Sequence, residues 1–310
     1  MSVTAPRVAS LIPCGTEIVA ALGMADTLVG RSHCCDYPAE VLELPVLSRP
    51  RVDPAAPGAD IDREVRRLLR EGESVYEILM EPLLAAAPDV VVTQDHCDAC
   101  AVSLRDVRAA MRCAELAGAR VCALHPHDLD AVRDDLGRVA GALGVPERGA
   151  RLSARFGERL ERLRGRTERL DRPRVLLLEW LDPPMVAGGW IPELARIAGL
   201  EPLIVEDASS FVQVGWDDLE RAGADAAVVL PCGFTVERSL RELASGAARD
   251  GLDRLAEGLP RGCWIVDGDA YLNRPGPRLA DSAELLARIF HETACCEAGA
   301  GHAGAFCRFG

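Results

Sequence analysis

Short apolar runs alternate with amphipathic stretches along most of this chain. Two of the clearest runs are Asp89–Gln94 and Ala224–Leu230. Runs of this length predict buried β-strands, whereas apolar residues that recur every three or four positions predict helices. Strands that alternate with helices are typical of an α/β fold with mainly parallel sheets. We therefore predict that fold class.

One segment, Glu147–Leu170, has a helical pattern throughout and contains no proline. Its apolar residues form a single stripe on an otherwise charged helix: Leu152, Phe156, Leu160 and Leu163. At a rise of about 1.5 Å per residue, such a helix would extend about 36 Å. We expect residues 147–170 to form one long helix that joins two lobes.

The segments on the two sides of this helix have similar patterns. Three pairs of segments correspond: Arg7–Leu22 with Arg174–Leu200, Asp89–Cys97 with Asp225–Cys232, and Arg120–His125 with Cys263–Asp267. This predicts two similar α/β lobes, residues 1–146 and 171–294, with a ligand cleft between them. Residues 295–310 are rich in glycine and alanine and have no periodicity, which predicts a flexible tail that contains cysteine and histidine.

Length, charge and cysteine content narrow the class of protein. The 310 residues suit two lobes, and the net charge of −13 disfavours a nucleic-acid partner. No apolar run reaches the length of a membrane span. The segment Met1–Arg7 lacks the features of a secretory signal, so we expect a cytoplasmic protein. In that compartment the twelve cysteines are expected to be reduced thiols or metal ligands rather than disulfides.

Three loops that follow predicted strands contain cysteine, and such loops carry ligands in doubly wound sheets. Together they contribute four thiols: Cys35, Cys97, Cys100 and Cys232. Four thiolates suit zinc or an iron–sulfur cluster, which would make the chain a metalloprotein or an enzyme. Reduced thiols beside an organic ligand are an alternative. A redox pair of the thioredoxin kind, formed by Cys97 and Cys100, is a third interpretation.

Motifs spread over residues 7–290 are specific enough to indicate a family. They are Ser10–Ile18, Val29–Pro38, Thr93–Val102, Glu179–Gly188, Leu230–Phe234 and Asn273–Arg278. Together they resemble the cobalamin-binding and iron-complex-binding proteins of the ABC-transporter substrate-binding class, the two-lobed type with a single helical backbone. The resemblance implies a protein that closes two lobes over a cobalamin-like corrinoid or a related metal complex. It implies an ABC permease as partner only if the chain is exported.

Aromatic, basic and imidazole side chains near the predicted strand ends are the candidate ligand contacts. Flat macrocycles favour aromatic and methionine contacts, metals take imidazole nitrogen, and guanidinium groups hold peripheral carboxylates. The candidates are Trp180, Met185, Trp190, Tyr271, Phe234, His33, His96, Arg31, Arg49, Arg274 and Arg278. Core packing explains any one tryptophan equally well. The sequence contains no Ser-His-Asp arrangement, phosphate loop or dinucleotide fingerprint, which favours a binding protein over an enzyme.

Overall fold

The chain divides into two compact units, each built from more than one segment. The computed structural model describes residues 5–97, 99–113, 116, 118–205, 211–291 and 304–310. The first unit comprises residues 1–56, 60–126 and 130–156, and the second comprises 57–59, 127–129 and 157–310. Among the described residues, no helix is both long and apolar enough to cross a membrane.

The first unit is built around a four-stranded sheet whose strands are all parallel, in the order β2-β1-β5-β6. Up to residue 142 the chain forms β1 (Val8–Ser10), α1 (Pro13–Ala21), β2 (Leu28–Arg31), β3 (Ser48–Pro50), α2 (Gly58–Arg70), β4 (Tyr76–Ile78), α3 (Met80–Ala86), β5 (Val90–Gln94), α4 (Leu104–Ala110), β6 (Arg120–Leu124) and α5 (Leu129–Ala142), with short 3-10 helices at Ala25–Thr27 and Ala39–Glu43. Strands β3 and β4 pair separately, in antiparallel fashion.

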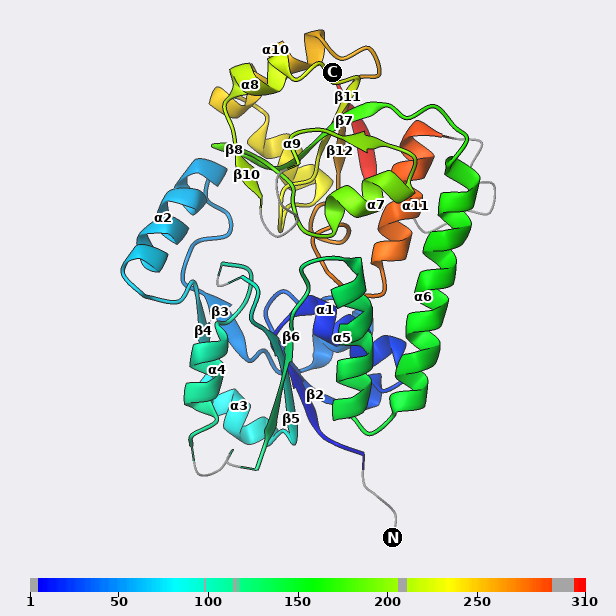
Figure 1. Cartoon of the computed structure of the whole chain (residues 1–310). Coiled ribbons are helices and arrows are strands. Elements are labelled where there is room, and N and C mark those ends of the chain that lie inside the picture. The colour runs from blue at the N-terminus through cyan, green and yellow to red at the C-terminus, as the bar shows by residue number, and fades with distance from the viewer. Residues whose placement is uncertain (1–4, 98, 114–115, 117, 206–210, 292–303) are drawn as a thin grey trace. The chain divides into compact units, whose positions relative to one another are not determined.

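Helices cover both faces of this sheet, as the continuous apolar character of β5 predicts. On one face, Val91 of β5 shares a core with Leu83 of α3 and Val107 of α4. On the other face α1 lies so close that a Cβ on Gly15 would be 2.7 Å from Val92 Cγ1. Figure 1 shows α5 on the same side as α1. Because helices cover both faces, the loops that follow the carboxyl ends of the strands lie at an end of the sheet that these helices leave uncovered.

The second unit contains a larger, mixed sheet in the order β10-β8-β7-β11-β12-β13, with β9 paired to β7. Its elements are β7 (Arg174–Leu181), β8 (Pro184–Val186), α7 (Ile191–Ile197), β9 (Glu201–Pro202), β10 (Val212–Gln213), α8 (Trp216–Arg221), β11 (Ala226–Val229), α9 (Val236–Glu242), α10 (Ala247–Glu257), β12 (Cys263–Val266), α11 (Leu279–Phe290) and β13 (Phe306–Phe309). Leu176 and Val229 pack with Leu219 of α8 and Leu252 of α10 on one face. Helices α7 and α11 lie on the other (Figure 1).

The α/β architecture predicted from the sequence, with two lobes and one long helix, is confirmed. Helix α6 spans Pro146–Thr167, and the boundary between the units falls inside it, after Phe156. The paired segments also correspond: β1-β5-β6 in the first unit and β7-β11-β12 in the second are both parallel and have the same order. The interlobe cleft stays a prediction.

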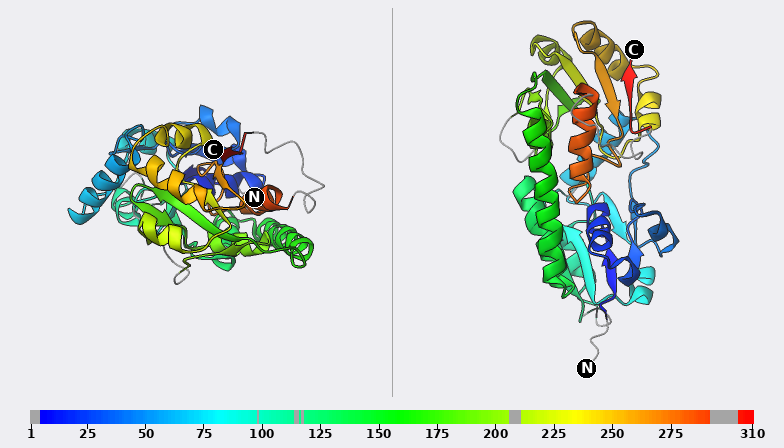
Figure 2. Two further views of the ribbon diagram at one scale, coloured as in Figure 1. Left: turned by 90° about the horizontal axis from the view of Figure 1, so that it is seen from above. Right: turned by 90° about the vertical axis from the view of Figure 1, so that its right-hand side faces the viewer.

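Two details differ from the expectations. The predicted tail lies in part outside the described residues, but its end forms β13, which pairs antiparallel with β12 (Figure 2). The prediction of a flexible tail is therefore wrong for residues 306–309, where Phe309 is buried against the core of the second sheet. The sheet of the second unit is also less uniformly parallel than expected, because β8, β10 and β13 run antiparallel to their neighbours.

Candidate functional site

The carboxyl ends of the parallel strands of the first unit form one edge of its sheet, here called the first carboxyl edge. The loops after β2, β5 and β6 place Ser32–Cys35, Asp95–Cys97 with Cys100, and His125 at this edge. Ligands bind at this position in open α/β sheets. The sequence analysis identified the first two of these loops.

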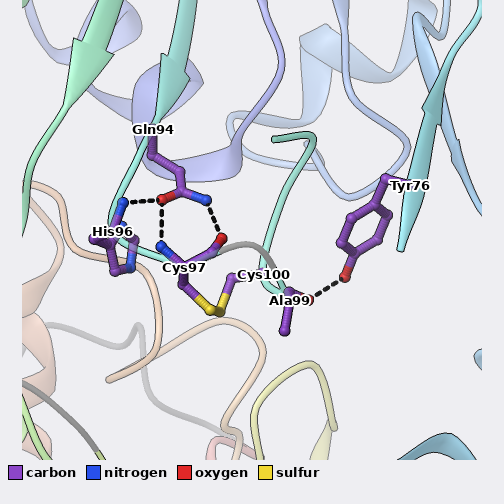
Figure 3. Close-up of a disulfide and its surroundings, with 6 residues drawn as sticks. All are labelled: Tyr76, Gln94, His96, Cys97, Ala99 and Cys100. Atoms are coloured by element: carbon purple, nitrogen blue, oxygen red, sulfur yellow. Dashed lines mark hydrogen bonds between the residues drawn. A yellow bond between two sulfur atoms is a disulfide. The ribbon is translucent and has the colours of Figure 1, made fainter. Parts of the chain in front are cut away.

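A disulfide between Cys97 and Cys100 lies at this edge (Figure 3). The backbone beside it is held by Gln94, the last residue of β5, whose side chain is buried. The Gln94 Oε1 atom accepts hydrogen bonds from the backbone N–H groups of His96, at 2.7 Å, and Cys97, at 2.9 Å, and its Nε2 atom donates to the Cys97 carbonyl at 2.5 Å. We call this arrangement the Gln94 clamp.

For Cys97 and Cys100, the disulfide corrects the expectation that the cysteines are thiols or metal ligands, whereas eight other described cysteines are not in disulfides. While Cys97 and Cys100 are bonded to each other, neither sulfur is a thiolate, so a four-thiolate centre would require their reduction. Within the described residues, no group of three or more histidine, cysteine, aspartate or glutamate side chains is arranged to hold a metal ion. Cys35 and Cys232 belong to different units. The zinc or iron–sulfur site therefore stays a prediction that the oxidised state does not support.

Cys35 and Arg31 take part in hydrogen bonds inside the first unit. The Cys35 thiol is buried and receives a hydrogen bond from Thr16 Oγ1 at 3.0 Å. The Arg31 guanidinium donates to the backbone carbonyls of Ser32 and Cys35, both at 3.1 Å. These contacts shape the loop after β2, and they explain why an arginine stands there independently of any ligand.

Two histidines of this edge, His96 and His33, have lowered pKa values. Desolvation lowers the pKa of His96 to about 4, and it also lowers the pKa of His33. The Nδ1 atom of His33 lies 3.0 Å from Ser48 Oγ. A further pair, which the sequence analysis did not propose, joins His125 Nδ1 to Asp95 Oδ1 at 2.5 Å. The register of β5 and β6, which pairs Gln94 with Leu124, brings this histidine and carboxylate together.

The corresponding edge of the second unit, the second carboxyl edge, has a different chemistry. Trp180, at the end of β7, packs on Phe234, with ring centroids 5.1 Å apart. The guanidinium of Arg238 lies 4.4 Å from the centroid of the Phe234 ring and forms an ion pair with Glu242 at 3.0 Å. The two charged side chains are only 15 % and 10 % exposed. We call these four residues the aromatic–ion-pair cluster.

A small pocket of about 160 Å³ lies at this cluster. It is lined by Gly58, Trp180, Leu181, Asp182, Pro231, Phe234 and Glu242. Gly58 belongs to the short segment 57–59 of the second unit, and its N–H donates to Glu242 Oε1 at 2.8 Å. Glu242 therefore receives one hydrogen bond from a backbone amide and one from Arg238, which satisfies a carboxylate that is mostly withdrawn from water.

The other candidates from the second unit have local partners. Trp190 is buried, and its indole N–H donates to the Leu272 carbonyl at 2.6 Å. Arg274 is 5 % exposed and pairs with Asp269 at 3.0 Å, and the Arg278 guanidinium lies 5.1 Å from the Tyr271 ring centroid. The remaining candidates lie in both units. Met185 is buried in β8, and Cys232 is partly exposed in the loop after β11. Arg49, in the first unit, forms an exposed ion pair with Glu77. A ligand-binding role for these residues stays a prediction.

Glu179 is a titratable group at the second carboxyl edge that the sequence analysis did not single out. Desolvation raises the pKa of its carboxyl group to about 7, although a hydrogen bond from the Gly188 backbone acts in the opposite direction. Its neighbour Trp180 was selected because it is aromatic. The sequence does contain one sign that Glu179 is unusual. It is an acidic residue near the end of a mostly apolar strand, Arg174–Leu181.

Comparisons with known proteins agree with this architecture. The model of the family described as periplasmic binding protein matches residues 8–250. None of the curated proteins matches the chain in sequence.

Solved structures match almost the whole chain. The apo form of the periplasmic haem-binding protein RhuT from Roseiflexus sp. RS-1 is 25% identical, with a TM-score of 0.68, over 94% of this chain and 99% of that protein. A periplasmic haem-binding protein from Pseudomonas aeruginosa is 20% identical, with a TM-score of 0.66, over 93% and 94%. The periplasmic vitamin B12-binding protein BtuF of Vibrio cholerae is 20% identical, with a TM-score of 0.62, over 94% and 99%.

Proposed function

Because the chain belongs to the periplasmic binding protein family, we propose that it is a binding protein for a metal tetrapyrrole, either a cobalamin-like corrinoid or a haem. The observation that carries the proposal is the aromatic–ion-pair cluster at the second carboxyl edge. Support comes from the similar solved structures, whose ligands are haem and vitamin B12. If the chain is exported, an ABC permease is its proposed partner.

The cluster offers the contacts that a tetrapyrrole needs. The paired rings of Trp180 and Phe234 provide an apolar surface for a flat macrocycle. Arg238, placed beside them, carries a charge that suits a peripheral carboxylate or amide. The pocket at the cluster is too small to enclose a tetrapyrrole. We therefore propose that the ligand rests on the rings and extends beyond the pocket.

The first carboxyl edge supplies candidate contacts for the metal. Imidazole binds a metal through an unprotonated nitrogen, and desolvation keeps both His96 and His33 neutral at pH 7. We propose His96 as the first residue to test, because its pKa of about 4 leaves it neutral across the physiological range.

Titration of the full chain with hydroxocobalamin and, separately, with hemin tests the proposal. We expect a saturable change in the visible absorption spectrum with one of the two, at a dissociation constant of about 1 μM or lower. A replacement of His96 by alanine should alter the metal-sensitive bands if its imidazole is a ligand. Absence of saturable binding of either compound up to about 100 μM would overturn the proposed function.

Two tryptophans provide a matched pair of variants. Trp180→Leu removes the ring that packs on Phe234, and we expect it to weaken binding at least about tenfold, or about 1.4 kcal/mol. The control is Trp264→Leu in β12, where the ring packs on Phe290 and Phe306, outside the cluster. Equal losses in the two variants would indicate a general effect on folding, and the cluster would then not be the site.

A further inference from the structure

The disulfide between Cys97 and Cys100 has no role in the binding function proposed above. It lies in a loop at an open sheet edge, directly after β5. We propose that this pair is a thiol–disulfide exchange site that accepts two electrons from thiol reductants, either two thiols of one molecule or two molecules of a monothiol such as glutathione. This proposal is independent of which ligand the chain binds.

The two cysteines differ in exposure. Residue Cys100 is exposed, whereas Cys97 is only partly exposed. A disulfide is opened by a thiolate that approaches one sulfur and releases the other, so access decides which sulfur is attacked. The structure therefore assigns Cys100 as the attacked residue and Cys97 as the leaving group.

The Gln94 clamp keeps Cys97 in place. Its three hydrogen bonds go to the backbone of His96 and Cys97, not to either sulfur (Figure 3). Tyr76 adds a hydrogen bond from its hydroxyl group to the Ala99 carbonyl, at 3.1 Å, between the two cysteines. Because these contacts do not involve the disulfide, they persist when it opens. The two thiols then remain close together, which favours their reoxidation.

The short spacing of the two cysteines in the sequence argues against a role of the disulfide in stabilising the fold. Disulfides that close long loops restrict the unfolded chain most, and this one joins residues only three positions apart. The core that contains Val91 and Val107 includes neither Cys97 nor Cys100. A short, accessible crosslink at a sheet edge is suited to exchange.

The exchange is balanced as follows. One thiolate of the reductant attacks Cys100 Sγ, which forms a mixed disulfide and releases Cys97 as a thiolate that takes up a proton. The second thiol of the reductant loses its proton and attacks its own sulfur in the mixed disulfide, which releases Cys100. The protein gains two electrons and two protons, and the reductant leaves as a disulfide.

Equilibration of the full chain in glutathione buffers tests the proposal. The protein is acid-quenched and alkylated, and the 97–100 peptide is followed by mass spectrometry, so that the other cysteines do not interfere. We expect the pair to change from oxidised to reduced as reduced glutathione rises to about 10 mM, with unchanged circular dichroism. A pair that stays oxidised at that concentration without oxidised glutathione, or that is reduced only when the protein unfolds, is a structural disulfide and overturns the proposal.

Single variants test the assignment of the two sulfurs. Cys97→Ser leaves the exposed Cys100, and Cys100→Ser leaves the less exposed Cys97. We expect Cys97→Ser to form the mixed disulfide with oxidised glutathione about tenfold faster. Equal rates, or a faster Cys100→Ser variant, would refute the assigned order of attack. Cys34→Ser, which removes an exposed thiol from another loop, is the control and should leave the reduction of the pair unchanged.

Discussion

The two carboxyl edges share a strand order and differ in chemistry. The first presents a disulfide, neutral histidines and the Asp95–His125 pair, all in loops beyond the ends of its strands. The second presents Trp180 and Phe234 beside a mostly buried ion pair and the carboxyl group of Glu179. One architecture therefore supports two kinds of surface, because the strands fix only where the loops begin.

The two units also differ in the exposure of their ion pairs. In the second unit, Arg238 and Glu242 are mostly removed from water, so each requires the other. In the first unit, the ion pair between Arg49 of β3 and Glu77 of β4, outside the first carboxyl edge, is 62 % and 38 % exposed, so water can replace either partner. Substitutions in the two ion pairs should consequently have effects of very different size.

The largest effect is expected from Glu242→Ala. It would leave the charge of Arg238 without its partner and the Gly58 N–H without its acceptor. We expect a loss of about 3 kcal/mol in the free energy of unfolding, measured by urea denaturation. Glu242→Gln, which keeps an acceptor for Gly58, should recover part of this loss. A loss below about 1 kcal/mol for the alanine variant would show that the pair behaves like an exposed one.

A pH-dependent effect is expected from Glu179. Its pKa in the folded protein, about 7, is above the usual value of 4.5, so the folded state binds the proton more tightly than the unfolded state. The stabilisation is complete below about pH 4.5 and is lost as the pH rises through 7, by about 3 kcal/mol in total.

Glu179→Gln should remove this dependence. We expect the variant to be more stable than the parent at pH 8 and similar to it at pH 4.5, as measured by thermal unfolding at both pH values. Equal slopes of stability against pH in the two proteins would indicate that the carboxyl group does not titrate in this range.

Each edge also contains an amide side chain that fixes a loop, and their removal should have intermediate effects. Gln94 makes three hydrogen bonds to the loop after β5, whereas the Asn273 Nδ2 atom donates to the carbonyls of Leu230 and Gly268, at 2.9 and 2.8 Å. We expect Gln94→Leu and Asn273→Leu each to lower the free energy of unfolding by about 2 kcal/mol.

Hydrogen exchange separates the two amide variants. Gln94→Leu should raise exchange in the loop after β5 alone, and Asn273→Leu should raise it in the loops after β11 and β12. Increased exchange throughout either unit would mean that the amide supports the whole core instead of one loop.

The smallest effect is expected from Glu77→Ala in the exposed pair of the first unit. The Arg49 guanidinium would exchange the carboxylate for water, so the loss should be below about 1 kcal/mol and should shrink further at high salt. A loss as large as that of Glu242→Ala would remove the contrast between the two ion pairs.

The sequence predicted the scaffold better than the site. The runs around β5 and β11 were found because strands buried on both faces are continuously apolar. The long helix was predicted from its single stripe of apolar residues, and α6 begins one residue before the predicted start. These features depend on local periodicity, which is visible in a single chain.

The site depends on pairings that local pattern does not contain. Whether Cys97 bonds to Cys100 is set by the turn between them, and the partner of His125 is set by the register of β5 with β6. In the sequence, Gln94 is only the polar last residue of an apolar run. Its hydrogen bonds go to backbone atoms, which every sequence provides, so no pattern of residues indicates them. Strand β13 was missed because four residues that follow a glycine-rich segment give too short a pattern.

The division of the second unit among three segments restricts how the molecule can be dissected. A gene fragment that encodes residues 157–310 would contain the whole second sheet but not the segment 57–59. Its product would lack the amide of Gly58, and the Glu242 carboxylate would lose one of its two donors. The fragment would also lack residues 127–129, so surface display, isotope labelling by segments and split-reporter fusions should keep the chain intact.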